Sequence, residues 1–169
     1  MAEQFLTLMA DYCEEDQARI LQWYNALQQA GFTGQQTEGL PMHISLATFP
    51  LDREDEAIAL TERVAAQFAP VEADIRHVGI FPGGRVLFAA PDMSDALVAL
   101  QQACGAGDVG GYAWTPHTTM LIDEPERIGQ AVPVLMKHFM PIRARIDRLH
   151  LCAFWPTREI LRVELTGTK

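Results

Sequence analysis

The chain reads PMHISL at residues 41–46 and TPHTTM at residues 115–120. Each stretch contains a histidine, one further residue, a hydroxyl side chain and an apolar residue, in that order, shortly after a proline. The apolar surroundings predict that both stretches are β-strands, in which side chains two residues apart share a face. We therefore predict two strands that each present an imidazole and a hydroxyl group to one shared cleft.

His43 with Ser45, and His117 with Thr119, form a set that suits phosphodiester chemistry. In-line attack on phosphorus needs one group that accepts a proton from the nucleophile and another that donates a proton to the leaving oxygen. Histidine titrates near neutral pH, so two histidines can divide these roles, and either could start as the base. Hydroxyl groups can donate hydrogen bonds to the phosphate oxygens on which charge develops. We predict that both histidines are catalytic and that Ser45 and Thr119 bind the phosphate.

The remaining histidines and the cysteines predict neither a metal nor another cofactor. The five histidines lack the spacing of a metal motif, and the three cysteines are far apart with no CxxC pair. Buried, reduced thiols are the expected state of the cysteines. We expect a structural role for His77 and a partly exposed strand position for His150.

The acidic charge restricts the ligands that the protein can bind. The formal net charge is −9, whereas an extended nucleic-acid surface needs clustered basic residues. Residues 143–148 contain the one local basic cluster, and Asp147 interrupts it. We expect a small cyclic phosphodiester or an RNA terminus as ligand. Phe81, Tyr112 and Trp114 could stack on a base there, and ordinary packing is the alternative for all three.

Strands and helices alternate outward from the two motifs. We predict strands at residues 5–10, 42–49, 72–80, 85–89, 115–122, 142–146, 149–154 and 160–165. Helices are predicted at residues 14–30, from Asp52, at residues 92–104, and from a cap at Asp123. Each motif strand is followed by a break with Pro and Asp and then by a helix, so two similar halves related by an approximate twofold axis are expected.

The length of 169 residues suits one domain. No apolar run is long enough to span a membrane, and residues 1–4 do not look like the start of a secretory signal. We therefore expect a cytoplasmic location, and a monomer is favoured.

The two motifs resemble the repeated His-x-Thr/Ser-apolar pattern of the 2H phosphoesterase superfamily, which includes LigT-like 2′-5′ RNA ligases and cyclic nucleotide phosphodiesterases. The resemblance implies an α+β fold, bilobal and pseudo-twofold symmetric, with two antiparallel-rich sheets around a central cleft and helices on the outside. Residues 1–169 would form a single domain of two interleaved lobes.

The resemblance also implies an activity: opening of a 2′,3′-cyclic phosphate, or a related small cyclic phosphodiester, to a monoester without a metal ion. His43 and His117 would be the acid–base pair, with Ser45 standing where threonine is commoner. No basic residue lies beside either motif. The alternatives are a 2′-5′ RNA ligase or RNA-end processing enzyme, and a non-catalytic module that binds a phosphorylated ligand.

Overall fold

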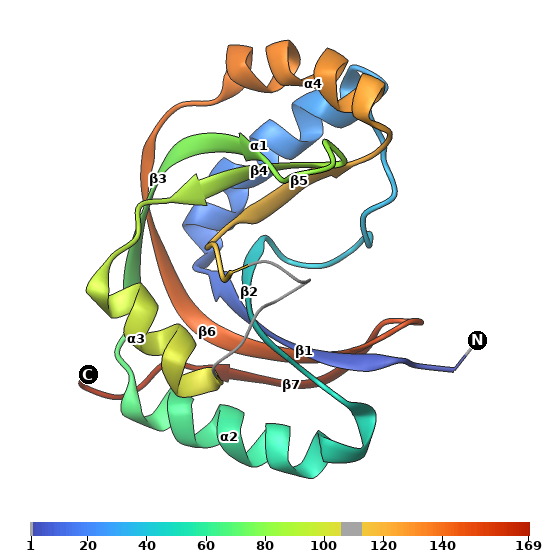
Figure 1. Ribbon diagram of the computed structural model, residues 1–169. Helices are drawn as coiled ribbons and strands as arrows, with labels where there is room; N and C mark the ends of the chain where they lie inside the picture. Colours follow the sequence, from blue (N-terminus) through green and yellow to red (C-terminus); the bar gives the residue numbers. More distant parts are fainter. Residues whose placement is uncertain (1, 106–112) are drawn as a thin grey trace.

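The computed structural model describes residues 2–105 and 113–169 and has an α+β fold, as expected (Figure 1). Within these ranges the strands are β1 (Phe5–Tyr12), β2 (His43–Phe49), β3 (Val71–Ile80), β4 (Val86–Pro91), β5 (Thr118–Ile122), β6 (Ile142–Phe154) and β7 (Arg158–Glu164). The helices are α1 (Glu14–Gln29), α2 (Glu54–Gln67), α3 (Asp95–Cys104) and α4 (Pro125–His138), with a 3₁₀ turn η1 (Leu51–Arg53) before α2.

The expectation of two sheets needs correction, because the seven strands form one continuous sheet. Its order is β2-β1-β6-β3-β4-β5, with β7 also paired to β6, and every pairing is antiparallel. The long strand β6 joins the two halves: its first residues pair with β3 and its later residues pair with β1. The approximate twofold symmetry stays a prediction.

Strand β6 also replaces the two strands predicted at residues 142–146 and 149–154. The prediction left the polar pair Asp147 and Arg148 between two strands, but β6 runs through it. Asp147 is the extra residue of a β-bulge, since Ile146 and Arg148 pair with consecutive residues of β1. The Asp147 carboxylate accepts a hydrogen bond of 2.9 Å from Nε of Arg148, so the two polar side chains satisfy each other without a turn.

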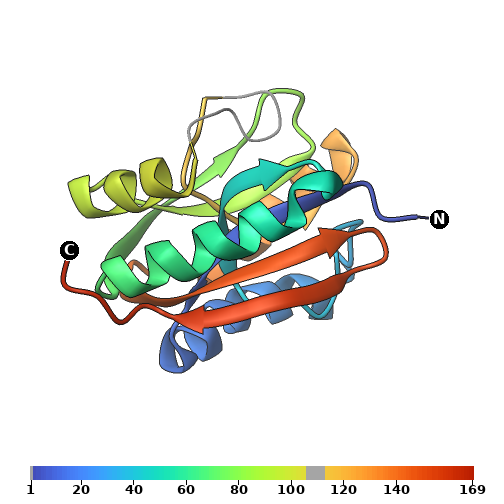
Figure 2. The ribbon, with the colours of Figure 1, turned by 90° about the horizontal axis from the view of Figure 1, so that it is seen from below.

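The helices pack in two pairs on the outside of the curved sheet. Helices α1 and α4 contact each other near β4 and β5, at the top of Figure 1. Helices α2 and α3 contact each other on the other half, and Figure 2 shows α2 running along the β6–β7 hairpin. Helix α1 turns Ile20, Trp23 and Leu27 inward at helical spacing, and all three are buried. No helix in the described ranges is both long and apolar enough to cross a bilayer.

Three helix starts differ from the prediction. Helix α2 begins at Glu54 and not at Asp52, which lies in the turn η1. Helix α3 begins at Asp95 and not at residue 92, because the Ser94 hydroxyl accepts the hydrogen bond from the N–H of Leu97 and caps it. Asp123 does not occupy the cap position of α4; Glu124 does, and Asp123 accepts the Glu124 N–H at 2.8 Å. The cysteines are free thiols, with Cys104 and Cys152 buried and Cys13 half-buried.

Candidate active site

Strand β2 presents His43 and Ser45 on one face, as strand alternation predicts. Both side chains are half-buried, while Ile44 and Leu46 on the other face are fully buried in the core. Leu46 is the extra residue of a bulge, because Ser45 and Ala47 pair with consecutive residues of β1. Such bulges re-aim side chains and are common beside active sites.

The second motif has the same local geometry, although its strand is shorter than predicted. Strand β5 begins at Thr118, so His117 lies just before it; Pro116 has no N–H to donate to a ladder. Thr119 is half-buried, and Met120 is the extra residue of a bulge against β4. In both motifs the apolar residue after the hydroxyl residue therefore forms a bulge.

Both imidazole rings are held by a carbonyl group two residues earlier in the chain. Nδ1 of His43 lies 2.7 Å from the Pro41 oxygen, and Nδ1 of His117 lies 2.8 Å from the Thr115 oxygen. A carbonyl oxygen only accepts, so Nδ1 carries the hydrogen in each ring. Among the described residues no hydrogen bond reaches either Nε2. Nε2 is thus the nitrogen that each ring offers for proton exchange.

Two hydrogen bonds tie the motif segments together across the sheet. The Tyr12 and Thr118 hydroxyl groups are 2.9 Å apart in a buried contact, and Nε1 of Trp114 donates to the Ser45 carbonyl at 2.9 Å. Burial raises the pKa of Tyr12, so this phenol stays neutral. These links hold β5 and the segment before it close to β1 and β2, and so bring the two motifs to one place.

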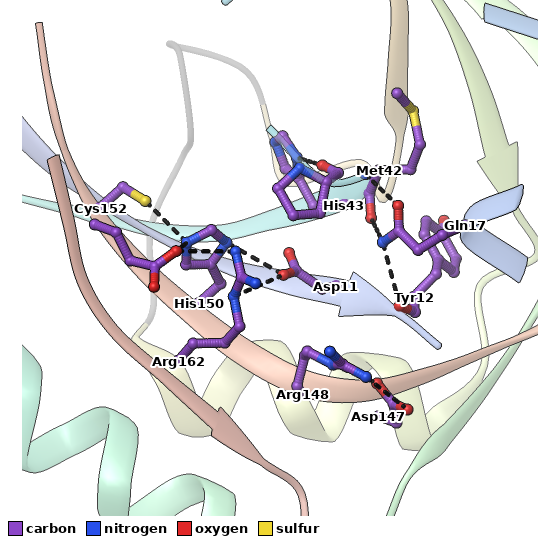
Figure 3. Close-up of polar contacts among 12 residues, drawn as sticks. Asp11, Tyr12, Gln17, Met42, His43, Asp147, Arg148, His150, Cys152 and Arg162 are labelled. Atoms are coloured by element: carbon purple, nitrogen blue, oxygen red, sulfur yellow. Dashed lines mark hydrogen bonds and ion pairs between the residues drawn. The ribbon is translucent and has the colours of Figure 1, made fainter. Parts of the chain in front are cut away.

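Gln17 of α1 fixes the backbone next to His43. Its side-chain oxygen accepts from the N–H of Met42 at 2.7 Å, and its amide nitrogen donates to the Met42 carbonyl at 2.7 Å (Figure 3). Met42 directly precedes the histidine. This double contact limits how far the start of β2 can move.

A pocket of about 670 Å³ opens over the site. His43, Ser45 and Thr119 line it, and so does Thr118, which alternation alone placed on the opposite face. His117 is not among the described lining residues, although it interacts electrostatically with His43. The aromatic residues that line the pocket come from β1, from α1 and from the end of β6 with the residue after it: Phe5, Tyr12, Tyr24, Phe154 and Trp155.

Phe81 and Trp114, which were suggested for base stacking, are not among the described lining residues of the pocket. Trp114 is half-buried, packs against the core and donates the hydrogen bond to Ser45 described above. Phe81 contacts the His117 ring edge-on, with ring centres 4.7 Å apart. Tyr112 lies outside the described residues. Stacking stays a prediction for all three residues. Trp155, which is 46% exposed in the pocket wall, is a further aromatic surface.

The pKa of each motif histidine is lowered, chiefly by burial. For His43, burial is opposed by the hydrogen bond to Pro41 and by Asp11, and is reinforced by the nearby His150. For His117, burial is opposed by the hydrogen bond to Thr115 and reinforced by the neighbouring His43. Near neutral pH these shifts favour uncharged imidazoles.

Several charged residues near the site were missed, or were given another role. The pocket is also lined by Asp11 in β1, Arg148 in β6 and Arg162 in β7. The two arginines are basic residues of the kind that is absent beside both motifs in the sequence. The prediction that His150 is partly exposed was wrong: the side chain is buried against Asp11 and Glu159. For Asp11 the sequence did contain a signal of a site residue, since this charged residue directly follows an apolar run.

Across residues 2–105 and 113–169, no group of three or more His, Cys, Asp or Glu side chains is arranged to hold a metal ion.

Comparison with known proteins places these features in a family. Residues 14–154 match the sequence model of the 2′-5′ RNA ligase superfamily. The structure of apo Escherichia coli LigT is similar, with a TM-score of 0.67 and 18% identity over 98% of this chain and 100% of that chain. E. coli LigT complexed with 3′-AMP gives a TM-score of 0.68 at 17% identity, covering 98% of this chain and 100% of that chain. A crystal structure described as a phosphoesterase gives 0.66 at 18% identity, covering 97% of this chain and 99% of that chain.

No match was found among curated proteins. The family match spans most of the chain and contains both motifs, and the solved structures share the fold over nearly its full length. The chain therefore belongs to the 2′-5′ RNA ligase superfamily, the group of two-histidine phosphoesterases that the paired motifs indicated.

Proposed function

We propose that the protein is a phosphodiesterase that opens a 2′,3′-cyclic phosphate, or a related small cyclic phosphodiester, to a phosphomonoester. The observation that carries this proposal is the matched pair of imidazoles. Each has Nδ1 bound to a backbone oxygen and Nε2 left for proton exchange, and each has a hydroxyl residue two positions further on. Family membership supports a phosphodiesterase or a ligase-like activity.

The proposed reaction needs only this chain and water. One histidine accepts a proton through Nε2 from a water molecule as its oxygen bonds to phosphorus. The other donates a proton to the ribose oxygen that leaves as the phosphorus–oxygen bond breaks. Ser45 and Thr119 donate hydrogen bonds to the non-bridging oxygens, which stabilises the charge that develops there. The two histidines exchange protonation states in one turnover, and solvent restores them.

The size and charge of the site favour a small substrate. A volume of about 670 Å³ lies in the range that suits a nucleotide-sized ligand. The net charge of −9 opposes a long polyanion but not a single phosphate beside Arg148 and Arg162. We also propose a cytoplasmic location and a monomeric state, which remain predictions.

The proposal is tested by incubating the protein with each nucleoside 2′,3′-cyclic phosphate in excess EDTA and following products by ³¹P NMR. We expect a single monoester product from each productive substrate, at a rate that the chelator does not change. Binding without turnover of any cyclic phosphodiester or RNA end would contradict the proposal and favour a non-catalytic binding module.

RNA ligation or RNA-end processing is the second candidate, favoured by the family to which the chain belongs. Structures of E. coli LigT complexed with 3′-AMP and with ATP show nucleotide binding by that protein. The discriminating assay offers an RNA strand with a 2′,3′-cyclic phosphate together with a strand bearing a 5′-hydroxyl. Joined product in excess over hydrolysed ends would favour ligation.

A further inference from the structure

The part of the pocket that lies beyond the motifs, along β1, β6 and β7, is rich in paired charges. We propose that it rejects a second phosphate group, and that Asp147 and Glu159 determine this specificity by neutralising the two pocket arginines. The inference rests on the proposed function and names its substrate class, which is a cyclic phosphodiester whose only charged group is the cyclic phosphate.

Strand register places both arginines some way from the first motif. Asp11 of β1 pairs with His43 on one side and with Arg148 on the other, so Arg148 lies two strands from His43. Arg162 belongs to β7, which is one strand further along the sheet. Because neighbouring strands are about 4.8 Å apart, the backbones of His43 and Arg148 are separated by roughly 10 Å. All four residues line one pocket, so the arginines lie beside the rest of the substrate.

Each pocket arginine is engaged by a carboxylate of this chain. Asp147 accepts hydrogen bonds from Nε and Nη2 of Arg148 at 2.9 and 3.3 Å (Figure 3). Glu159 accepts a hydrogen bond from Nη2 of Arg162 at 2.9 Å. These carboxylates occupy guanidinium donors that would otherwise bind a phosphate, which uses the same forked geometry. The two arginines therefore add little net positive charge to the pocket.

The other ionised groups leave this part of the pocket negative. Asp11 and His150 form a buried pair, with Oδ2 3.2 Å from Nδ1. Burial lowers the pKa of His150, but the contacts with Asp11 and Cys152 outweigh burial and raise the pKa to about 9, so this pair is neutral. Glu14 of α1 lines the pocket, and Glu164 of β7 lies in register beside the first arginine.

The pocket charges and their partners thus comprise five carboxylates and three cations: Asp11, Glu14, Asp147, Glu159 and Glu164, against Arg148, His150 and Arg162. A phosphate monoester carries about two negative charges near neutral pH. A net negative surface raises the free energy of such a group beside it, because like charges repel.

The rest of this wall is aromatic and suits an uncharged group. Phe5, Phe154 and Trp155 all line the pocket. The Phe5 ring stacks on Phe154 with ring centres 5.8 Å apart and meets Trp155 edge-on at 5.1 Å. Aromatic surfaces of this kind contact a sugar or a base through apolar burial and need no charge on the ligand.

The distinction concerns the 5′ oxygen of the substrate nucleoside. In a free nucleoside 2′,3′-cyclic phosphate this oxygen is an uncharged hydroxyl group. In an RNA terminus it carries a phosphodiester, and in a 5′-phosphorylated nucleotide it carries a monoester. A wall that opposes a second phosphate therefore favours the free nucleoside cyclic phosphate over both of the others.

The first test measures binding to the full-length wild type by calorimetry, with adenosine 3′-monophosphate and adenosine 3′,5′-bisphosphate as probes. We expect the monophosphate to bind roughly tenfold more tightly, because the second phosphate meets the negative wall. Rising salt concentration should narrow this difference, because salt screens charge. A bisphosphate that binds as tightly as the monophosphate, or more tightly, would overturn the proposal and favour an RNA terminus as substrate.

Two variants test the residues to which the specificity is assigned. Asp147→Asn and Glu159→Gln each remove one carboxylate and release one arginine, so each should narrow the preference for the monophosphate, while Glu159→Asp keeps the charge and should keep the preference. Glu56→Gln, on α2 outside the pocket, is the matched control and should bind both probes as wild type does. A preference that stays unchanged in both neutralised variants would overturn the assignment.

Kinetics supply the second measurement. In excess EDTA, kcat/KM of the wild type for adenosine 2′,3′-cyclic phosphate should exceed that for its 5′-phosphorylated form by roughly the factor seen in binding. Equal values for the two substrates would overturn the charge specificity and leave the proposed function intact. If neither compound is turned over while the monophosphate still binds more tightly than the bisphosphate, the proposed function fails and the charge specificity of the pocket stands.

Discussion

Replacing His150 by Gln should change how the stability of the protein depends on pH. In the unfolded chain a histidine has a pKa of about 6.5, whereas buried His150 in contact with Asp11 has a pKa of about 9. The folded state therefore binds this proton more tightly than the unfolded state does. The resulting stabilisation is fully present below about pH 6.5 and is lost as pH rises through about 9.

The size of the effect follows from that difference in pKa. Each unit corresponds to about 1.4 kcal/mol, so a rise from 6.5 to about 9 gives a contribution on the order of 3 kcal/mol. His150 is only 1% exposed, so solvent screening removes little of it. The difference in unfolding free energy between wild type and His150→Gln should shrink by about this amount between about pH 6 and pH 10.

Urea denaturation at a series of pH values measures this difference directly. Comparison with His150→Gln cancels the contributions of the other groups that titrate in the same pH range. His138, exposed at the end of α4, is the matched control: His138→Gln should keep the pH dependence of wild type. If the difference in unfolding free energy between wild type and His150→Gln is the same at about pH 6 and at about pH 10, His150 is not a protonated, ion-paired residue.

Three further variants test the packing and hydrogen bonds around the site. Tyr12→Phe and Thr118→Val should each lower the free energy of unfolding by about 1–3 kcal/mol, measured by urea denaturation, because each leaves one buried hydroxyl group without its partner. The double variant should lose little more than either single variant, because both partners are then gone. Fully additive losses would argue against that hydrogen bond. Gly79→Ala would place its Cβ 2.5 Å from the Phe88 ring, so we expect a loss of about 1–3 kcal/mol and slower turnover, since this ring packs on the second motif histidine; unchanged stability would contradict that packing. Ser45→Ala should lower kcat by about 10²–10³, and Ser45→Thr should restore it, because the hydroxyl group is what stabilises the phosphate charge; equal rates in both variants would exclude that role.

The sequence predicted the parts of the site that depend on local periodicity. Ile44 and Leu46 are buried and His43 and Ser45 share the pocket face, because a strand with one face in the core obeys a period of two. The helical spacing of Ile20, Trp23 and Leu27 was sufficient for α1 in the same way.

Features that depend on distant partners could not be read from local pattern. The bulge at Asp147 exists only in the pairing of β6 with β1, so the polar residue there looked like the end of a strand. His150 is buried because Asp11 from β1 and Glu159 from β7 contact it. Both contacts come from other strands, so the sequence around His150 does not indicate them. The same reason explains why Arg162 was missed: it reaches the site from β7, far from either motif in the chain.

The central claim is that the Nε2 atoms of His43 and His117 move the protons of the reaction. The most direct test is the rate of 2′,3′-cyclic phosphate hydrolysis in excess EDTA for wild type, His43→Ala and His117→Ala, with His138→Gln as the control. We expect each motif variant to lose about 10²–10⁴ in kcat while the control keeps the wild-type rate. A motif variant that retains wild-type turnover, or wild-type activity abolished by the chelator, would contradict the account.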